Sequence, residues 1–157
     1  LLDVLETANR FYVQDGLDKP FAITLLRLPE HTLPVYEGYT AKTVSNSIYD
    51  LVLVPSFKDE VSTGLIENKG WIKFLQQQHT AGAAVASFCT GAFLLAFAGL
   101  LDNRPATTHI NAEGVFAKMF PNVALKADAV VTEQDRVYTS GGATNTFHFV
   151  LNTARFY

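Results

Sequence analysis

The sequence is poor in cysteine and in basic residues, and both shortages exclude some classes of function. One cysteine among 157 residues excludes an internal disulfide and any site built from several thiolates. This usage is typical of a reducing compartment, so we expect a cytoplasmic protein. The net charge of −3 gives no broad basic surface for gripping nucleic acid. The four histidines are scattered without paired spacing, so we predict no metal site and no cofactor.

The chain also lacks a long uninterrupted apolar run and a visible signal peptide. Its most apolar stretch, residues 81–101, is broken by three glycines and by Ser87 and Thr90. Because a membrane span needs about 20 consecutive apolar residues, this stretch is interpreted as a strand, a turn and a helix. We therefore expect no membrane partner.

Short apolar runs alternate with helical patterns along the chain. Helices are predicted over 4–11, 64–78, 91–101, 111–120 and 144–156, and strands over 21–28, 49–54, 82–88, 123–125, 129–133 and 137–140. The run 49–54 is almost continuously apolar, which is typical of a strand buried on both faces of a parallel sheet. A Gln134-Asp135 turn is expected between the last two strands. The pattern predicts a doubly wound, mostly parallel α/β sandwich of the flavodoxin-like type, with residues 1–157 as one domain.

The single cysteine, Cys89, lies where a strand-like run changes abruptly into a helix-like one. A side chain at such an elbow is exposed above the sheet, and the free N–H groups of the new helix favour a thiolate. This setting predicts a reactive or anion-binding cysteine. The alternative is a small buried core residue, which is a common fate of free cysteine.

Two further residues are expected at the same edge of the sheet. His109 follows Cys89 by twenty positions, after a predicted short strand, and Asp3 stands at the head of the first helix. Ligands of such folds bind outside the carboxyl ends of the strands. A thiol, an imidazole and a carboxylate are the components of an activated thiol site, in which the base shares the thiol proton and the acid orients the base.

The segment around the elbow resembles a known family. Residues 85–109, VASFCTGAFLLAFAGLLDNRPATTH, are similar to the ThiJ/PfpI (class I glutamine-amidotransferase-like) superfamily. More narrowly, they resemble the amino-terminal domain of AraC-family transcriptional regulators of the GlxA type. Residues 1–6 resemble the superfamily's opening helix, whose first acidic residue approaches the cysteine, and residues 131–142 resemble its late hairpin and glycine turn.

The chain departs from the superfamily pattern at two places. Pro55-Ser56-Phe57 stands where the superfamily usually has Pro-Gly-Gly, whose backbone N–H groups help to form an oxyanion pocket. A bulky Phe57 at a glycine position argues against a working oxyanion hole. Thr90 stands where peptidase-like members place a histidine, so their triad cannot be assembled in the same way.

Two classes of function follow from the resemblance. In the first, the chain is the ligand-sensing domain of a regulator and binds a small metabolite. It would also form a homodimer and reach DNA only through a helix-turn-helix domain expected beyond residue 157. The residues expected to bind the metabolite are Cys89, Thr90, Gly91, His109, Asp3, Ser56 and Phe57. In the second, the chain is an enzyme, a hydratase, amidase or glyoxalase-like catalyst, with Cys89 as nucleophile and His109 and Asp3 as catalytic partners. The departures favour the first class.

Overall fold

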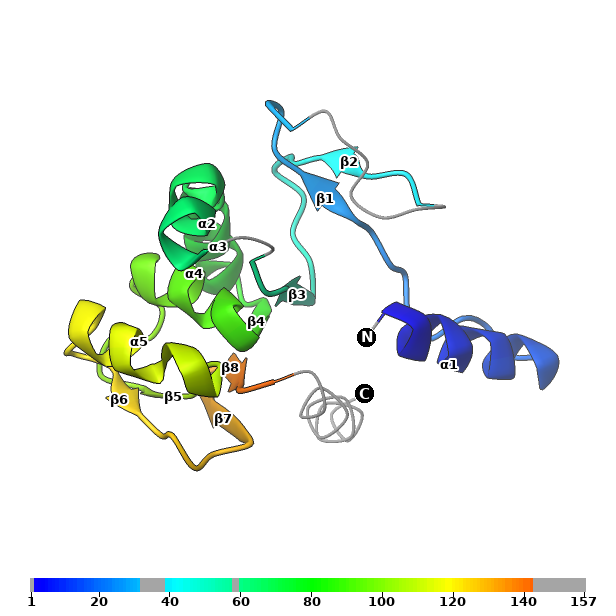
Figure 1. Ribbon diagram of the computed structural model, residues 1–157. Helices are drawn as coiled ribbons and strands as arrows, with labels where there is room; N and C mark the ends of the chain where they lie inside the picture. Colours follow the sequence, from blue (N-terminus) through cyan, green and yellow to red (C-terminus); the bar gives the residue numbers. More distant parts are fainter. Residues whose placement is uncertain (1, 32–38, 58–59, 143–157) are drawn as a thin grey trace. The chain divides into compact units, whose positions relative to one another are not determined.

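The computed structural model describes residues 2–31, 39–57 and 60–142 (Figure 1). The chain divides into two compact units, Leu1–Asn46 and Ser47–Tyr157, which we describe separately. The predicted closing helix over 144–156 lies outside the described residues.

The first unit is built around helix α1 (Leu2–Gln14). The helix ends at Gln14 and is closed by Gly16, whose positive φ of 75° allows a Schellman turn. In this turn Gly16 N–H donates to the Val13 carbonyl and Leu17 N–H donates to the Tyr12 carbonyl. The buried side chain of Asn9 bonds to both backbone groups of Phe21, at 2.9 and 3.0 Å. These bonds hold the segment that follows the helix against it.

Two short strands complete this unit. Strands β1 (Leu26–Arg27) and β2 (Lys42–Thr43) pair in parallel, so the strand predicted over 21–28 was too long. Strand β2 was not predicted, because two polar residues carry no hydrophobic period from which a strand can be recognised.

The second unit contains a four-stranded sheet in the order β3-β4-β8-β7. Its strands are β3 (Leu51–Val54), β4 (Ala84–Phe88), β7 (Val131–Gln134) and β8 (Val137–Ser140). Strands β3, β4 and β8 are parallel, and β7 runs antiparallel to β8. The prediction of a mostly parallel α/β sheet is confirmed. A separate parallel pair is formed by β5 (Pro105–Ala106) and β6 (Ala124–Leu125).

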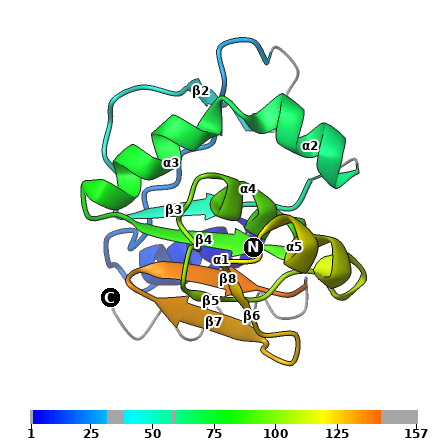
Figure 2. The ribbon, with the colours of Figure 1, turned by 90° about the vertical axis from the view of Figure 1, so that its left-hand side faces the viewer.

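Four helices lie on one side of this sheet, and α4 lies in front of β4 in Figure 2. They are α2 (Val61–Asn68), α3 (Trp71–Thr80), α4 (Ala92–Phe97) and α5 (Glu113–Met119). The single helix predicted over 64–78 was wrong. The chain forms two helices there, separated at 69–70, where Gly70 caps the second helix. Glycine costs about 1 kcal/mol within a helix and is therefore a favourable place for a break.

The core of this unit lies between α4 and its neighbours. The first five residues of α4 are all buried. The rings of Phe93 and Phe116 pack edge to face, with their centroids 4.9 Å apart. The ring of Phe120 packs against both of them. Since α4 begins just after Cys89, this packing fixes the position of the helix that follows the elbow.

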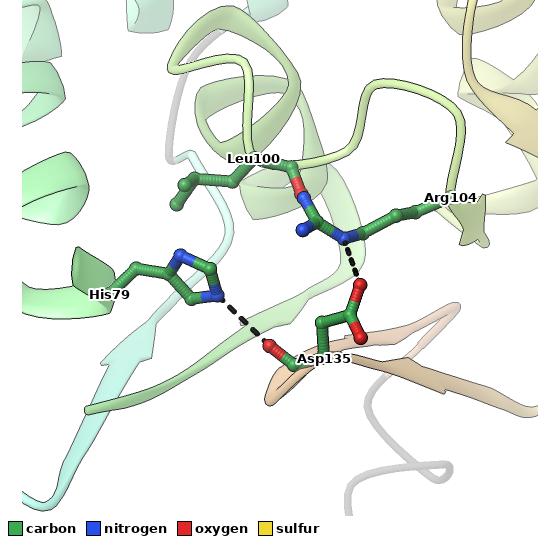
Figure 3. Close-up of polar contacts among 4 residues, drawn as sticks. All are labelled: His79, Leu100, Arg104 and Asp135. Atoms are coloured by element: carbon green, nitrogen blue, oxygen red, sulfur yellow. Dashed lines mark hydrogen bonds and ion pairs between the residues drawn. The ribbon is translucent and has the colours of Figure 1, made fainter. Parts of the chain in front are cut away.

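The turn between β7 and β8 consists of Asp135 and Arg136, one residue later than predicted. Both residues have positive φ, 52° and 63°, as a type I′ turn requires. Figure 3 shows how side chains hold the turn. His79 Nε2 donates to the Asp135 carbonyl at 2.9 Å, and Arg104 pairs with the Asp135 carboxylate at 3.2 Å while donating to the Leu100 carbonyl. These polar contacts lie at the amino-terminal ends of β4 and β8.

Among the described residues, none of the helices combines the length and apolar character needed to cross a membrane.

Candidate functional site

Cys89 occupies a strained elbow. It follows β4 directly, begins the short 3₁₀ helix η1 (Cys89–Gly91) and is half-buried. Its φ is 54°, whereas the preceding Phe88 is fully extended at φ −119° and ψ 135°. A residue other than glycine in this region costs about 1–3 kcal/mol, and such strain is concentrated at functional sites. The elbow predicted from the sequence therefore has the backbone geometry of a strand-to-helix nucleophile turn.

Hydrogen bonds made by four threonines support the elbow from the side of β5. The Thr108 hydroxyl donates to the Cys89 carbonyl at 3.1 Å, and Thr108 is almost fully buried. The preceding residue, Thr107, donates its N–H to Thr139 Oγ1 on β8 at 2.7 Å. Thr139 is in turn hydrogen-bonded to Thr132 on β7 at 2.6 Å. The sequence analysis included Thr107 and Thr108 only as part of the segment 85–109 and did not predict that they support the elbow.

Because Gly91 has no side chain, the start of helix α4 can pack directly against the end of β3. Gly91 is buried, and a Cβ atom built on it would lie 2.6 Å from the Pro55 carbonyl oxygen and 2.7 Å from that of Val54. Both oxygens belong to the backbone. Only a residue without a side chain fits here, so Gly91 acts in packing the elbow against the loop that follows β3.

The loop at residues 55–57 is tied to the elbow by a hydrogen bond. The N–H of Phe57 donates to Thr90 Oγ1 at 3.0 Å. The Phe57 side chain packs onto Gly64 of α2, where two of its ring carbons lie 2.5 and 2.8 Å from the position of a Cβ atom built on the glycine. Ser56 is exposed. The ring expected to block an oxyanion pocket is thus directed against α2, and the N–H of Phe57 is already bound by the neighbouring threonine.

His109 lies at the N-cap of η2 (Ile110–Ala112), immediately after Thr108, and is half-buried. Its Nδ1 accepts the Asn111 N–H at 3.3 Å, so a neutral ring carries its proton on Nε2. Within the part of the chain that the structure describes, no hydrogen bond joins the Cys89 thiol to this imidazole. The bond Thr108–Cys89 nonetheless places the start of the His109 turn at the elbow.

Asp3 lies exposed in the first turn of α1, in the unit Leu1–Asn46. Its approach to Cys89 stays a prediction. Among the described residues, no group of three histidine, cysteine or acidic side chains could hold a metal ion.

Two buried hydroxyl groups near the elbow were not predicted as site residues. Ser87, two residues before Cys89, is 1% exposed, and Ser140, at the end of β8, is 0% exposed. Neither Oγ atom has a hydrogen-bond partner among the residues that the structure describes. Ser140 pairs in register with Phe88, the residue before Cys89. Serine is common in strands and turns, so nothing in the sequence pattern singled these residues out.

The profile of the DJ-1/PfpI family matches residues 31–155. The chain belongs to this family. The resemblance of residues 85–109 to the ThiJ/PfpI superfamily is therefore confirmed. The solved structures agree on the fold. Schizosaccharomyces pombe DJ-1 has a TM-score of 0.64 at 15% identity and matches 96% of this chain and 84% of its own.

Several relatives of this DJ-1/PfpI chain are regulators. The HTH-type transcriptional regulator GbdR of Pseudomonas aeruginosa is 34% identical over 71 residues, which are 45% of this chain and 19% of GbdR. Isonitrile hydratase of Pseudomonas putida is 30% identical over 92 residues, 58% of this chain and 39% of the hydratase. An AraC family transcriptional regulator from Pseudomonas putida has a TM-score of 0.65 at 21% identity and covers 98% of this chain and 80% of its own. The chain thus matches well under half of these curated relatives' lengths.

Proposed function

We propose that this DJ-1/PfpI chain is the ligand-sensing and dimerisation domain of an AraC-family transcriptional regulator. It binds a small metabolite at the elbow, through Cys89, Thr90, Gly91, His109, Ser56 and Phe57. The observation that carries the proposal is the strained elbow at Cys89 in a chain whose relatives include transcriptional regulators.

The similarity to regulators supports this proposal. GbdR and CdhR of Pseudomonas aeruginosa are both named HTH-type transcriptional regulators, and CdhR is 28% identical over 74 residues. Regulators of this kind bind paired DNA half-sites, which a symmetric dimer matches. The acidic net charge is consistent with DNA contact through a separate helix-turn-helix domain.

A thermal-shift screen of metabolites tests the sensor role. A metabolite present at a hundred times its Kd adds about 2.7 kcal/mol to the stability of the folded state. For a chain of this size the melting temperature then rises by about 5–10 °C. We expect at least one such metabolite, with the shift reduced by Cys89→Ser and by His109→Ala. The matched control is His79→Gln, because His79 lies at the opposite ends of the strands and should leave the shift intact. A shift indifferent to both site substitutions would place the pocket elsewhere.

Sedimentation at micromolar concentration tests the assembly. We expect a homodimer that shows no DNA affinity of its own. A strict monomer at all concentrations would contradict the dimerisation role.

An enzyme of the hydratase type is the second candidate, favoured by the 30% identity to isonitrile hydratase. An alkyl isonitrile offered to the purified chain distinguishes the two. The sensor role predicts no more than trace turnover. Efficient turnover that Cys89→Ala abolishes in a folded protein would establish the enzyme instead.

A further inference from the structure

The loop at residues 55–57 holds a backbone donor next to the elbow. A preorganised N–H group beside a nucleophile is the usual means of stabilising an anionic oxygen during acyl transfer. The N–H of Phe57 lies close to the elbow in the chain, because its acceptor, Thr90, is the residue directly after Cys89. Whether this N–H is free or already hydrogen-bonded therefore determines whether it can stabilise an anionic oxygen at the elbow.

The N–H of Phe57 is occupied from within the chain. A backbone amide has one hydrogen, and Thr90 Oγ1 accepts it at 3.0 Å, within the normal range for such bonds. The acceptor is part of the same folded chain, so it is present at a high effective concentration. An anionic oxygen from solution must displace this hydroxyl before it can use the donor.

The packing on both sides of the bond keeps donor and acceptor together. On one side, Gly91 contacts the carbonyl oxygens of Val54 and Pro55 so closely that no Cβ atom would fit. On the other side, the Phe57 ring rests on Gly64 of α2. The loop is therefore held at both of its ends, and the bond to Thr90 is preorganised.

We propose that Thr90 closes the oxyanion donor of the 55–57 loop, so that the elbow binds small molecules without stabilising an anionic oxygen through Phe57 N–H. Thr90 is a positioning residue that acts through the amide of Phe57. This inference rests on the proposed sensor role and deepens it. It names the residue that occupies the Phe57 donor, and it predicts that simple carboxylates do not engage this donor.

The test compares the ¹⁵N-labelled chain with Thr90→Val and Thr90→Ser. Valine has nearly the shape of threonine but no hydroxyl, whereas serine retains the acceptor. In Thr90→Val we expect the Phe57 amide to exchange with solvent about tenfold faster than in the unsubstituted chain. Thr90→Ser should restore slow exchange. A role of Thr90 that depended on the shape of its side chain, and not on its hydroxyl, would not predict this rescue.

Acetate, a minimal carboxylate, is the second probe. The Phe57 amide resonance should show no saturable shift with acetate in the unsubstituted chain or in Thr90→Ser, and a saturable shift in Thr90→Val. A saturable shift in the unsubstituted chain would overturn the proposal, even if Thr90→Val failed to fold. Equal exchange rates in all three proteins would overturn it as well.

Different results would contradict the sensor role and the closing of the Phe57 donor by Thr90. Efficient isonitrile turnover with a closed Phe57 amide would remove the sensor role and leave the assignment of Thr90 intact. A metabolite hit at the elbow together with a free Phe57 amide would do the reverse.

Discussion

Gly91→Ala should destabilise the protein, although the position looks suited to alanine. The φ of Gly91 is −56°, a helical value at which alanine is ordinarily better than glycine by about 0.5–1 kcal/mol. However, the new Cβ would lie 2.6 and 2.7 Å from two carbonyl oxygens, well inside the 3.4 Å at which ordinary contact begins. Overpacking costs about 1–3 kcal/mol, and we expect about 3 because the opposing atoms are backbone.

Thermal and denaturant unfolding measure this effect directly. For a chain of this length the melting temperature should fall by about 6–12 °C. The matched control is Gly114→Ala on α5, where a Cβ would meet nothing within 4 Å and the substitution should be neutral or stabilising. If Gly91→Ala were as stable as Gly114→Ala, the close approach of the elbow to the end of β3 would be wrong.

The remaining predictions concern hydroxyl groups and strained backbone. Thr139→Val leaves the buried Thr107 N–H without its acceptor and should cost about 1–3 kcal/mol. Ser140→Ala removes a hydroxyl that has no partner in the described part of the chain and should be neutral or stabilising, and denaturant unfolding of both variants checks the contrast. Arg136→Gly creates the Asp-Gly pair favoured in type I′ turns and should raise stability by about 0.5 kcal/mol, while Arg136→Ala should not. Cys89→Gly should be more stable than Cys89→Ala by about 1 kcal/mol because both lose the thiol but only alanine keeps the strained φ; equal stability would refute the strain.

Much of the fold could be predicted from the sequence because its central strands are apolar on both faces. The runs that became β3 and β4 were located to within two or three residues. The predictions failed where the decisive feature was local geometry rather than hydrophobic period. The break at residues 69–70 and the shift of the hairpin turn to Asp135-Arg136 are of this kind.

The candidate site was predicted less completely than the fold. The change from strand to helix marked Cys89 as an elbow, and the φ of 54° agrees with that interpretation. The sequence did not show that Thr90 binds the Phe57 N–H, since that contact joins residues 33 positions apart. The sequence analysis attributed the loss of an oxyanion pocket to the bulk of Phe57, whereas we propose that the hydrogen bond from its N–H to Thr90 closes the donor. The identity of a residue specifies the size of its side chain but not the direction in which the side chain points.

The supports of the elbow also indicate where a bound molecule can have an effect. Thr108, Gly91 and Thr90 each hold the backbone around Cys89 through contacts made within the folded chain. Because these contacts all lie within the folded chain, the backbone at Cys89 is preorganised, and binding need not be accompanied by rearrangement of the elbow. The His109 turn is held more weakly, by a hydrogen bond of 3.3 Å, and the next residue, Ile110, is 73% exposed. A ligand that bonds to the Nε2 atom of His109 would therefore act on this turn, and through it on the apolar surface at Ile110, before it disturbed the strained cysteine.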